Sequence, residues 1–332
     1  MSIDFTQINN ILIIRLSSLG DILLTTPLIR TLKKKYPHCK IDFLLKTEYS
    51  DLLKKNPNIN KIIPYSKERI ASFNDTITKS FNLRDYDLII DLQNNLRSRR
   101  ITSKLKIRTK RFKKYSLRKF LLVKMKINLM KNLPSIPVRY AETIGIDLED
   151  AKVELYSDKE PNNKLVGLKN LVGICPGAKH FTKRYPIDYQ IQLCKMLIEK
   201  NYNVVLFGGN IDKEICHKII SEVPQVINLQ NNDDILQTIS DMRLCEVIIC
   251  NDSGLMHAAS SLNKKLITIF GSTVKEFGFM PYNSDTIVLE NENIRCRPCS
   301  HIGRSSCPKS HFKCMKEIKP ETVFKIINSI NA

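Results

Sequence analysis

The chain lacks an apolar run near the roughly 18 residues that a membrane-spanning helix needs, and this excludes an integral helical membrane protein. Its amino terminus has no basic stretch before the first apolar residues and no small-residue cleavage site, so a secretory signal is not expected. The motifs G-x-G-x-x-G and G-x-x-x-x-G-K-[ST] are also absent, which excludes the dinucleotide fingerprint and the P-loop. We therefore expect a cytoplasmic protein.

Acidic residues are missing from one long stretch. No Asp or Glu lies between Asp91 and Glu142, while these 50 positions hold 16 Lys or Arg and supply most of the net charge of +20. So much charge of one sign favours an anionic partner. Nucleic acid, anionic lipid and a phosphorylated glycan all fit at this point.

The first half of the chain alternates short apolar runs with segments of helix length. An apolar run at residues 11–16 is followed by the loop 17–21 and by an amphipathic stretch from about 23 to 36, which predicts a strand, a tight loop and a helix. Further strands are expected at residues 40–45, 61–64 and 87–92. Such alternation predicts a parallel sheet with helices on both faces.

The second half repeats this pattern. Strands are expected at residues 171–175, 203–207, 247–250 and 266–270, with helices at 187–200, 212–222, from Leu255 onward, and at 320–330. A length of 332 residues, at about 150 residues per domain, also points to two domains. The fold class is therefore predicted to be α/β, with a ligand cleft where the carboxyl ends of the two sheets face each other.

The domain boundaries follow from composition. We predict an amino-terminal domain over residues 1–156, with a basic excursion at about 96–131 that forms one or two surface helices or a mobile segment. The polar, Pro-containing stretch that starts at Ser157 marks a linker over 157–170. The carboxyl-terminal domain is predicted to span 171–332 and to include a Cys-rich segment at 296–314 and the terminal helix.

The ten cysteines fall into two kinds. In a long cytosolic chain thiols stay reduced, and the cysteines in or beside apolar runs are predicted to be core residues: Cys175, Cys194, Cys245 and Cys250. The Cys-rich segment has the spacing C-x2-C-x7-C-x6-C, formed by Cys296, Cys299, Cys307 and Cys314, with His301 and His311 between them. Two interpretations stay open for it, a structural zinc site and reduced thiols in a compact loop, and metal analysis distinguishes them.

Three loops that follow predicted strands carry residues suited to an anion. In the loop 17–21, Asp21 is either a helix cap or a general base at a strand end. The basic loop 176–186 is either solvated or brings Lys183 to a phosphate. The segment 251–257 starts a helix whose free N–H groups suit negative charge, and His257 within it is either structural or functional. Three such loops predict a phosphate-bearing ligand.

Several motifs together resemble one family over nearly the whole chain, from about residue 11 to 327. They are SSLGD with ILLTTPLIRTLKKKYP, DLQNNLRS, PGA...KRYP, NDSGLMHAAS and CRPC...CPKSHFKCM, in the order in which the family has them. The chain is similar to glycosyltransferase family 9, the ADP-heptose:lipopolysaccharide heptosyltransferases. This resemblance implies a GT-B fold, with two facing Rossmann-like domains that close on their substrates.

The resemblance also implies an inverting transfer that needs no metal, and it implies roles for residues. Asp21 corresponds to the catalytic base. The donor ADP-heptose is expected to contact Lys183, Thr182, Asn210, Asp252, Ser253, Gly254 and His257. The acceptor is expected on the amino-terminal domain, at Ser18, Gly20, Gln93, Arg97, Arg99 and Arg100.

The sequence departs from the family at three positions of the donor site. Ala178-Lys179 stands where some members have a Thr-Thr pair, so Thr182 or backbone amides are expected to take over the phosphate contacts. Tyr185 stands where tryptophan is frequent, and the chain contains no tryptophan. Asn210 replaces a frequent acidic residue, which affects recognition of ribose or adenine.

The predicted function is transfer of heptose to a Kdo or heptose acceptor on lipid A, at the cytoplasmic face of the inner membrane, with the anionic glycolipid and the membrane surface as partners. The alternatives are a family member that uses another nucleotide-sugar and a basic nucleic-acid-binding protein. Against the latter, the acid-free stretch has few aromatic residues for base stacking. Neutralising Lys113, Lys114, Arg118 and Lys119 tests whether the outer part of that stretch binds lipid.

Overall fold

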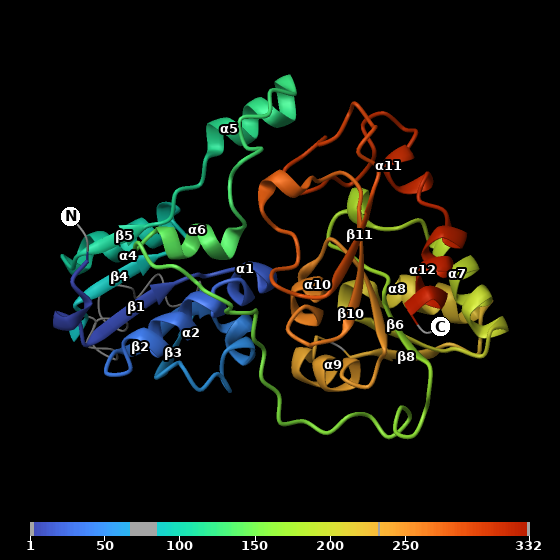
Figure 1. Cartoon of the computed structure of the whole chain (residues 1–332), viewed down its shortest axis with the longest axis horizontal. Helices are drawn as coiled ribbons and strands as arrows, with labels where there is room; N and C mark the ends of the chain where they lie inside the picture. The colour runs from blue at the N-terminus through green and yellow to red at the C-terminus, as the bar shows by residue number, and fades with distance from the viewer. Residues whose placement is uncertain (1–2, 67–84, 232, 331–332) are drawn as a thin grey trace. The chain divides into compact units, whose positions relative to one another are not determined.

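A computed structural model describes residues 3–66, 85–231 and 233–330 (Figure 1). The chain divides into two compact units. The amino-terminal unit comprises Met1–Tyr115 and Pro134–Tyr156, and the carboxyl-terminal unit comprises Ser116–Leu133 and Ser157–Ala332. The stretch between these two pieces of the amino-terminal unit, residues 116–133, thus belongs by its contacts to the carboxyl-terminal unit.

The amino-terminal unit contains a five-stranded parallel sheet in the order β3-β2-β1-β4-β5. Its strands are β1 (Asn10–Ile14), β2 (Lys40–Lys46), β3 (Lys61–Tyr65), β4 (Leu88–Asp91) and β5 (Thr109–Arg111). The inner strands β1 and β4 are apolar and almost entirely buried, as expected for a parallel sheet covered on both faces. Part of the helix-length segment expected between β3 and β4 lies outside the described residues.

Strand order changes direction between β1 and β4, because the chain moves outward to β2 and β3 and then returns to the other side of β1. The carboxyl ends of these two strands therefore lie at the change in strand order, which is the position where open α/β sheets bind ligands. The loop after β1 runs into α1 (Leu19–Leu23), and the loop after β4 runs into α4 (Leu96–Leu105).

The helix expected at about 23–36 corresponds to α2 (Thr26–Lys35), whereas α1 is a separate short helix that includes residues 19–21 of the expected loop. Pro27 lies in the first turn of α2 and has no N–H to continue a helix from α1. The hydroxyls of Thr25 and Thr26 donate instead to the carbonyls of Ile22 and Leu23. Helix α1 has only five residues and begins after Ser18, so Asp21 lies in its first turn.

The basic stretch contains more regular structure than the sequence predicted. After α4 the chain forms β5 at the edge of the sheet, and then α5 (Ser116–Phe120) and the π-helical turn η5 (Leu121–Met125). A strand of the sequence TKR lacks the apolar alternation by which strands are recognised, and its edge position explains why it tolerates two charges. Residues 116–133 join the carboxyl-terminal unit through Leu122 and Met130, which pack against Phe277. The amino-terminal unit ends with α6 (Ile136–Glu142).

The carboxyl-terminal unit contains a six-stranded parallel sheet in the order β11-β10-β9-β6-β7-β8. Its strands are β6 (Leu171–Cys175), β7 (Asn203–Gly208), β8 (Ile227–Gln230), β9 (Val247–Asn251), β10 (Lys265–Phe270) and β11 (Thr286–Glu290). The edge strands β8 and β11 were not predicted, and both are only partly buried. The direction of strand order changes between β6 and β9, so the loops after these two strands lie at the position where open α/β sheets bind ligands.

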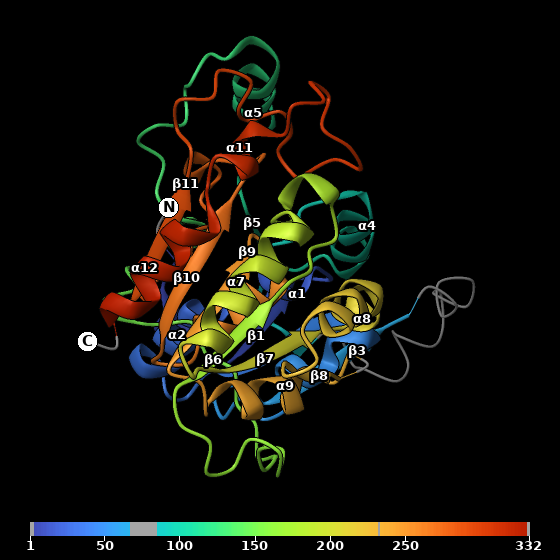
Figure 2. The ribbon, with the colours of Figure 1, turned by 90° about the vertical axis from the view of Figure 1, so that its right-hand side faces the viewer.

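The helices of this unit are α7 (Ile187–Glu199), α8 (Lys213–Glu222), α9 (Ile235–Met242), α10 (Gly254–Ala259), α11 (Lys313–Lys316) and α12 (Pro320–Ile330). Helices α7 and α12 lie side by side (Figures 1 and 2) and share one hydrophobic core with β6, β7 and β9. The prediction that Cys175, Cys194, Cys245 and Cys250 are core residues is confirmed, since all four are buried.

The predicted α/β class, with two Rossmann-like parallel sheets, is confirmed. Residues 157–170, the predicted linker, contain no helix or strand. Within the described part of the chain, no helix combines the length and the apolar character needed to cross a bilayer.

Candidate functional site

The loop after β1 holds a buried ion pair. Arg15 Nη2 and Asp21 Oδ1 lie 2.6 Å apart, and the two side chains are only 10% and 18% exposed. Arg15 is fixed from the other side, because its Nη1 donates to the carbonyl of Leu92 at 2.8 Å and its Nε to that of Ser17 at 3.0 Å. Its guanidinium also lies 5.8 Å from the centroid of the buried ring of Tyr140. Arg15 therefore joins the ends of β1 and β4 and holds Asp21 between them.

Asp21 is kept ionised by this setting. Burial acts to raise the pKa of its carboxyl group, but the positive charge of Arg15 and the hydrogen bonds from Ser18 outweigh burial, and the net pKa lies below the ordinary value. Ser18 donates to Asp21 Oδ2 with its hydroxyl at 2.8 Å and with its backbone N–H at 3.2 Å. A carboxylate that is charged near neutral pH and lies at a strand end can accept a proton from a substrate hydroxyl.

Gln93 and Gly20 shape the same loop. The side-chain oxygen of Gln93 accepts the backbone N–H of Leu16 at 2.9 Å and of Ser17 at 3.3 Å, so the residue after β4 fixes the residues after β1. Gly20 is buried in the first turn of α1. Among the predicted acceptor residues, Ser18 contacts Asp21 directly, and Gln93 contacts the backbone of the same loop.

The three predicted arginines lie on α4, whose amino terminus is capped by Asn95. All three side chains are exposed, and Arg99 Nε donates to Asn94 Oδ1 at 2.9 Å. Lys114 was not among the predicted site residues, yet it is half-buried, and its pKa is lowered first by burial and then by the charge of Arg15, with a further contribution from Arg99. Arg15, Arg99 and Lys114 therefore form a positive environment around Asp21 and the buried Asp91.

In the carboxyl-terminal unit, a second ion pair joins the loops after β6 and β9. Lys183 Nζ lies 2.7 Å from Asp252 Oδ2, and the side chains are 16% and 7% exposed. The hydroxyl of Thr273, in the loop after β10, donates to the same Asp252 oxygen at 2.5 Å. Asp252 thereby positions the Lys183 ammonium group at the point where strand order changes direction. Thr273 was missed in the sequence because the segment Gly271-Ser272-Thr273 matches no recognised motif.

Helix α10 begins next to this pair, with Ser253 as its N-cap and Gly254 as its first residue. The hydroxyl of Ser253 is buried and makes no hydrogen bond to any residue that the structure describes. His257 lies in the same helix and is 4% exposed. Of the segment 251–257, Asp252 is thus in direct contact with Lys183, and the Ser253 hydroxyl has hydrogen-bonding capacity left for a ligand.

Thr182 and Asn210, both predicted to bind the donor, form hydrogen bonds with other residues of the protein. The Thr182 hydroxyl accepts the backbone N–H of Arg304 at 2.8 Å, and the side chain is 1% exposed. Asn210 donates its backbone N–H to Asp233 Oδ1 at 2.9 Å and its side-chain amide to Oδ2 at 2.6 Å. As placed, both residues are engaged within the protein, and their contacts with a donor stay predictions.

A buried carboxylate near these loops was also missed. Asp212 precedes α8 and accepts the N–H of Gly209 at 3.0 Å, and burial raises the pKa of its carboxyl group. A Cβ atom at Gly177 would lie 1.6 Å from Asp212 Oδ1. The glycine of the PGA motif is thus required by close packing between the loop after β6 and the start of α8.

The Cys-rich segment forms hydrogen bonds with the loops that carry the Lys183 site. The N–H of Cys299 donates to the carbonyl of Ser272 at 3.2 Å, and Arg297 Nη2 donates to that of Thr273 at 2.8 Å. The N–H of Thr182 donates to the carbonyl of Arg304 at 3.1 Å. The loops that carry Thr273 and Lys183 are therefore both fixed by this segment.

The chain is similar over most of its length to known glycosyltransferases. The family model of glycosyltransferase family 9 (heptosyltransferase) matches residues 76–309. Lipooligosaccharide heptosyltransferase 2 of Haemophilus influenzae is 28% identical over 97% of this chain and 99% of its own, and lipopolysaccharide heptosyltransferase 2 of Escherichia coli is 26% identical over 96% and 98%.

Two solved structures share the fold. Heptosyltransferase II of E. coli superposes with a TM-score of 0.72 at 22% identity, over 97% of this chain and 98% of that one. A glycosyltransferase family 9 protein of Veillonella parvula gives a TM-score of 0.80 at 20% identity, over 99% and 98%. With the family model matching most of the chain, this protein belongs to glycosyltransferase family 9 and is a glycosyltransferase.

Proposed function

We propose that this enzyme transfers a heptose from ADP-heptose to the inner core of lipopolysaccharide, with a Kdo or heptose residue on lipid A as acceptor. The similarity of nearly the whole chain to heptosyltransferases 2 supports this substrate class. The observation that carries the proposal is the ionised Asp21 at the change in strand order of the first sheet, because transfer to a sugar hydroxyl needs a base at that place.

Asp21 acts as the general base in this proposal. It accepts the proton of the acceptor hydroxyl as the oxygen attacks the anomeric carbon of the heptose, while the bond to ADP breaks on the opposite face and the configuration inverts. Arg15 keeps the carboxylate ionised and in place, and Ser18 fixes its orientation. The exposed Arg97, Arg99 and Arg100 bind the acid groups of the acceptor.

The loops around Lys183 hold the donor. Lys183 stabilises the negative charge that grows on the diphosphate as ADP departs, and the Ser253 hydroxyl and the start of α10 contribute hydrogen bonds to the ADP part. These groups supply the positive charge that the leaving group needs, so the transfer step is proposed to require no metal. For transfer to occur, the acceptor that Asp21 deprotonates must react with the donor that the Lys183 loops hold.

The acid-free stretch is proposed to bind the cytoplasmic face of the inner membrane. Within residues 116–133, large apolar side chains are exposed between basic ones: Leu117 is 71% exposed, Met125 59% and Phe120 55%. Leu122 and Met130 of the same segment face Phe277 and anchor it. Apolar side chains among lysines and arginines fit the boundary between acyl chains and anionic headgroups.

Product analysis tests the function most directly. The purified enzyme is incubated with ADP-heptose and a panel of truncated lipopolysaccharides that end in Kdo, in one heptose or in neither, and the products are identified by mass spectrometry. The proposal expects addition of one heptose to an acceptor that ends in Kdo or heptose. Transfer from another nucleotide-sugar alone, or no transfer to any member of the panel, contradicts it.

Vesicle flotation tests the membrane proposal. Neutralising Lys113, Lys114, Arg118 and Lys119 to Gln is expected to lower affinity for anionic vesicles roughly 1000-fold, because about 1 kcal/mol is lost for each of the four charges. The matched control replaces Lys195 and Lys218, which are exposed on α7 and α8, and leaves vesicle binding unchanged. Equal binding of both variants to anionic vesicles contradicts the proposal.

A further inference from the structure

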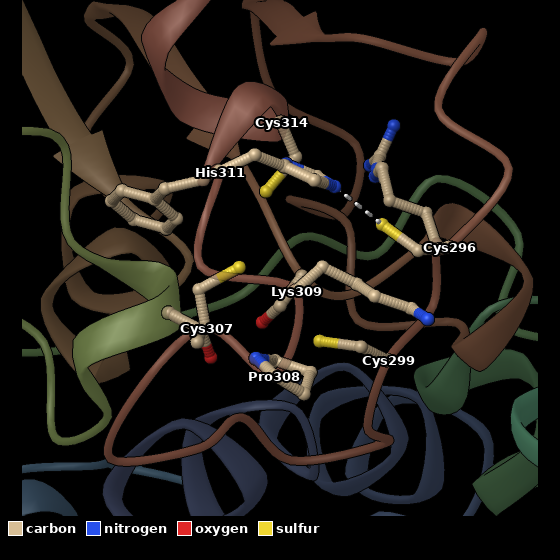
Figure 3. A pocket seen from close by; sticks show the side chains of 11 residues that line it. Cys296, Cys299, Cys307, Pro308, Lys309, His311 and Cys314 are labelled. Carbon is tan, nitrogen blue, oxygen red and sulfur yellow. Dashed lines mark hydrogen bonds between the residues drawn. The ribbon is translucent and has the colours of Figure 1, made fainter.

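The Cys-rich segment of the carboxyl-terminal unit lines a small cavity with Cys296, Cys299, Cys307 and Cys314 (Figure 3). Among the side chains that the structure describes, no three His, Cys, Asp or Glu residues are grouped so that they could hold one metal ion. The thiols as placed therefore do not form a metal site. A basic group that is already placed to bind a ligand lies instead in the amino-terminal unit, in the loop after β5.

This group is Lys114, three residues after the end of β5. The N–H of Phe112 donates to the carbonyl of Asp91 at 3.0 Å, and the side-chain amide of Asn94 donates to the Phe112 carbonyl at 2.8 Å. These two bonds join the start of the loop to the end of β4. Because the sheet is parallel, the loop after β5 leaves it at the same edge as the loop of the general base.

The Lys114 side chain is half-buried, and no hydrogen bond or ion pair joins its ammonium group to a residue that the structure describes. Burial lowers the pKa of Lys114, and the charges of Arg15 and Arg99 lower it further, whereas those of Asp91 and Asp21 raise it. The ammonium group is thus within electrostatic range of the Asp21 site. An ammonium group has three donors, so Lys114 retains its full capacity for an anion.

Arg139 of α6 fixes the residues on both sides of Lys114. Its guanidinium lies 5.1 Å from the ring centroid of Phe112 and 4.8 Å from that of Tyr115, and its Nη2 donates to the Lys113 carbonyl at 3.1 Å. Tyr115 also has a left-handed backbone conformation with φ of 52°, which is uncommon for a bulky residue and must be held by its surroundings.

The guanidinium of Arg139 is costly to keep in this place. Arg139 is only 3% exposed, and its Nε and Nη1 make no hydrogen bond within the described ranges of the chain. A buried charge without a carboxylate partner usually destabilises a protein, and an apolar side chain of similar size would pack at lower cost. What the charge adds is its contact with two rings and with the carbonyl before Lys114.

Tyr140, the residue after Arg139, connects this loop with the base. Its buried ring lies 4.8 Å from that of Phe112, with 72° between the ring planes. The same ring lies 5.8 Å from the guanidinium of Arg15, which pairs with Asp21. The aromatic rings thus pack the loop after β5 against the side chain that holds the general base.

We propose that Lys114 binds an anionic group of the acceptor next to the hydroxyl that Asp21 deprotonates, and that Arg139 is the positioning residue that holds Lys114 there. The inference rests on the proposed heptose transfer and defines one of its acceptor contacts. The anionic group is a carboxylate or a phosphate of the acceptor saccharide, and an ammonium group binds either through charge-assisted hydrogen bonds. No bond of the acceptor forms or breaks at Lys114.

Steady-state kinetics with a deacylated, soluble acceptor test the role of Lys114 without a contribution from membrane binding. Lys114→Gln is expected to raise the acceptor KM about 10- to 100-fold, with kcat and the KM for ADP-heptose unchanged, because the lost contact exists before and during transfer. The matched control Lys110→Gln removes the charge of another half-buried lysine, within β5, and leaves the acceptor KM unchanged. An acceptor KM that Lys114→Gln does not change overturns the proposal.

Modified acceptors identify the anion. In one the carboxyl group of Kdo is a methyl ester, and in the other the phosphates are removed. The effect of Lys114→Gln on KM is expected to disappear with the ester if a carboxylate is bound, and with the dephosphorylated acceptor if a phosphate is bound. An effect of full size with both modified acceptors overturns the proposal.

A double-mutant cycle tests Arg139. Arg139→Met is expected to raise the acceptor KM about fivefold or more in the wild type and to add little in Lys114→Gln, because Arg139 acts through Lys114. Arg139→Lys keeps a charge and a donor for the Lys113 carbonyl and is expected to recover part of the loss. Additive effects of Arg139→Met and Lys114→Gln overturn the positioning role. If Arg139→Met does not fold, Lys114→Gln with the modified acceptors still decides whether Lys114 binds the anion.

Failure of the proposed function has a different signature. If the wild type transfers no heptose to the unmodified acceptor, the proposed function is wrong and this inference is wrong with it. If the wild type transfers heptose and Lys114→Gln behaves like Lys110→Gln, only the inference about Lys114 and Arg139 is overturned.

Discussion

Replacing Arg15 by Gln is expected to shift the pH dependence of catalysis. In the wild type, Arg15 Nη2 lies 2.6 Å from Asp21 Oδ1, and its charge opposes the effect of burial, so that the pKa of Asp21 is lowered. In the variant, burial, the hydrogen bonds from Ser18 and the charge of Lys114 remain. The amide of Gln preserves a donor, but the positive charge is lost.

The size of the expected change in the pKa of Asp21 follows from its ion pair with Arg15. An opposite charge at this distance lowers a carboxyl pKa by about 1–3 units, and each unit corresponds to about 1.4 kcal/mol. Both side chains are less than one-fifth exposed, so solvent does not weaken the interaction much. The acidic limb of kcat/KM is therefore expected to move upward by about 1–3 pH units.

Arg15→Gln is also expected to lower the free energy of unfolding near neutral pH. Because the folded pKa of Asp21 is lowered, its ionisation stabilises the wild type above the ordinary carboxyl pKa, and this stabilisation is lost as the pH falls through the folded value. In Arg15→Gln that contribution is reduced or reversed near neutral pH. Urea unfolding at several pH values is expected to show the largest loss of stability at neutral pH and a smaller loss in acid.

The assay compares kcat/KM from about pH 4 to 8 for the wild type, Arg15→Gln and the control Arg30→Gln. Arg30 pairs with Glu154 in the same unit and has no contact with Asp21 among the described interactions, so its loss leaves the acidic limb unchanged. An unchanged limb in Arg15→Gln, with measurable activity, refutes the reasoning that Arg15 sets the ionisation of the base.

Three further predictions concern the carboxyl-terminal unit. Lys183→Ala is expected to weaken ADP binding about 10- to 100-fold by calorimetry, because a charge-assisted contact is lost, whereas Lys179→Ala, in the same loop and exposed, leaves it unchanged. Thr273→Val removes the 2.5 Å hydrogen bond to Asp252 and is expected to raise the Kd for ADP about fivefold; an unchanged Kd contradicts a positioning role. Gly177→Ala is expected to lower the free energy of unfolding by about 1–3 kcal/mol, since its Cβ would meet Asp212, and adding Asp212→Ala should recover part of the loss in urea unfolding.

The strands at the centre of both sheets could be predicted from the sequence, because strands buried on both faces appear as continuous apolar runs. The edge strands could not. TKR in β5 and INLQ in β8 carry charged or polar side chains toward solvent, and backbone pairing with a neighbouring strand decides their conformation. The short helix α1 was expected as a loop, and its separation from α2 at Thr25 depends on local hydroxyl bonding that periodicity does not reveal.

The site was predicted in part. Asp21, Lys183 and Asp252 lie in motifs at strand ends, where the topology of a parallel sheet brings ligand-binding residues together. The residues that position them come from other parts of the chain: Arg15 ends an apolar run, Thr273 follows β10, and Lys114 lies in a stretch whose many basic residues obscure any single one. Their roles depend on contacts between segments distant in sequence, and one sequence alone does not contain that information.

The central claim is that Asp21 is the general base of a heptose transfer. The most direct test measures heptose transfer from ADP-heptose to a truncated lipopolysaccharide acceptor by Asp21→Asn, together with ADP affinity by calorimetry. Asparagine keeps the size of the side chain and its hydrogen bonds with Arg15 and Ser18 in part, but it cannot accept the acceptor proton. We expect turnover to fall by about 10²- to 10⁴-fold with ADP affinity unchanged. Retention of more than a tenth of the wild-type rate would show that another group removes the proton.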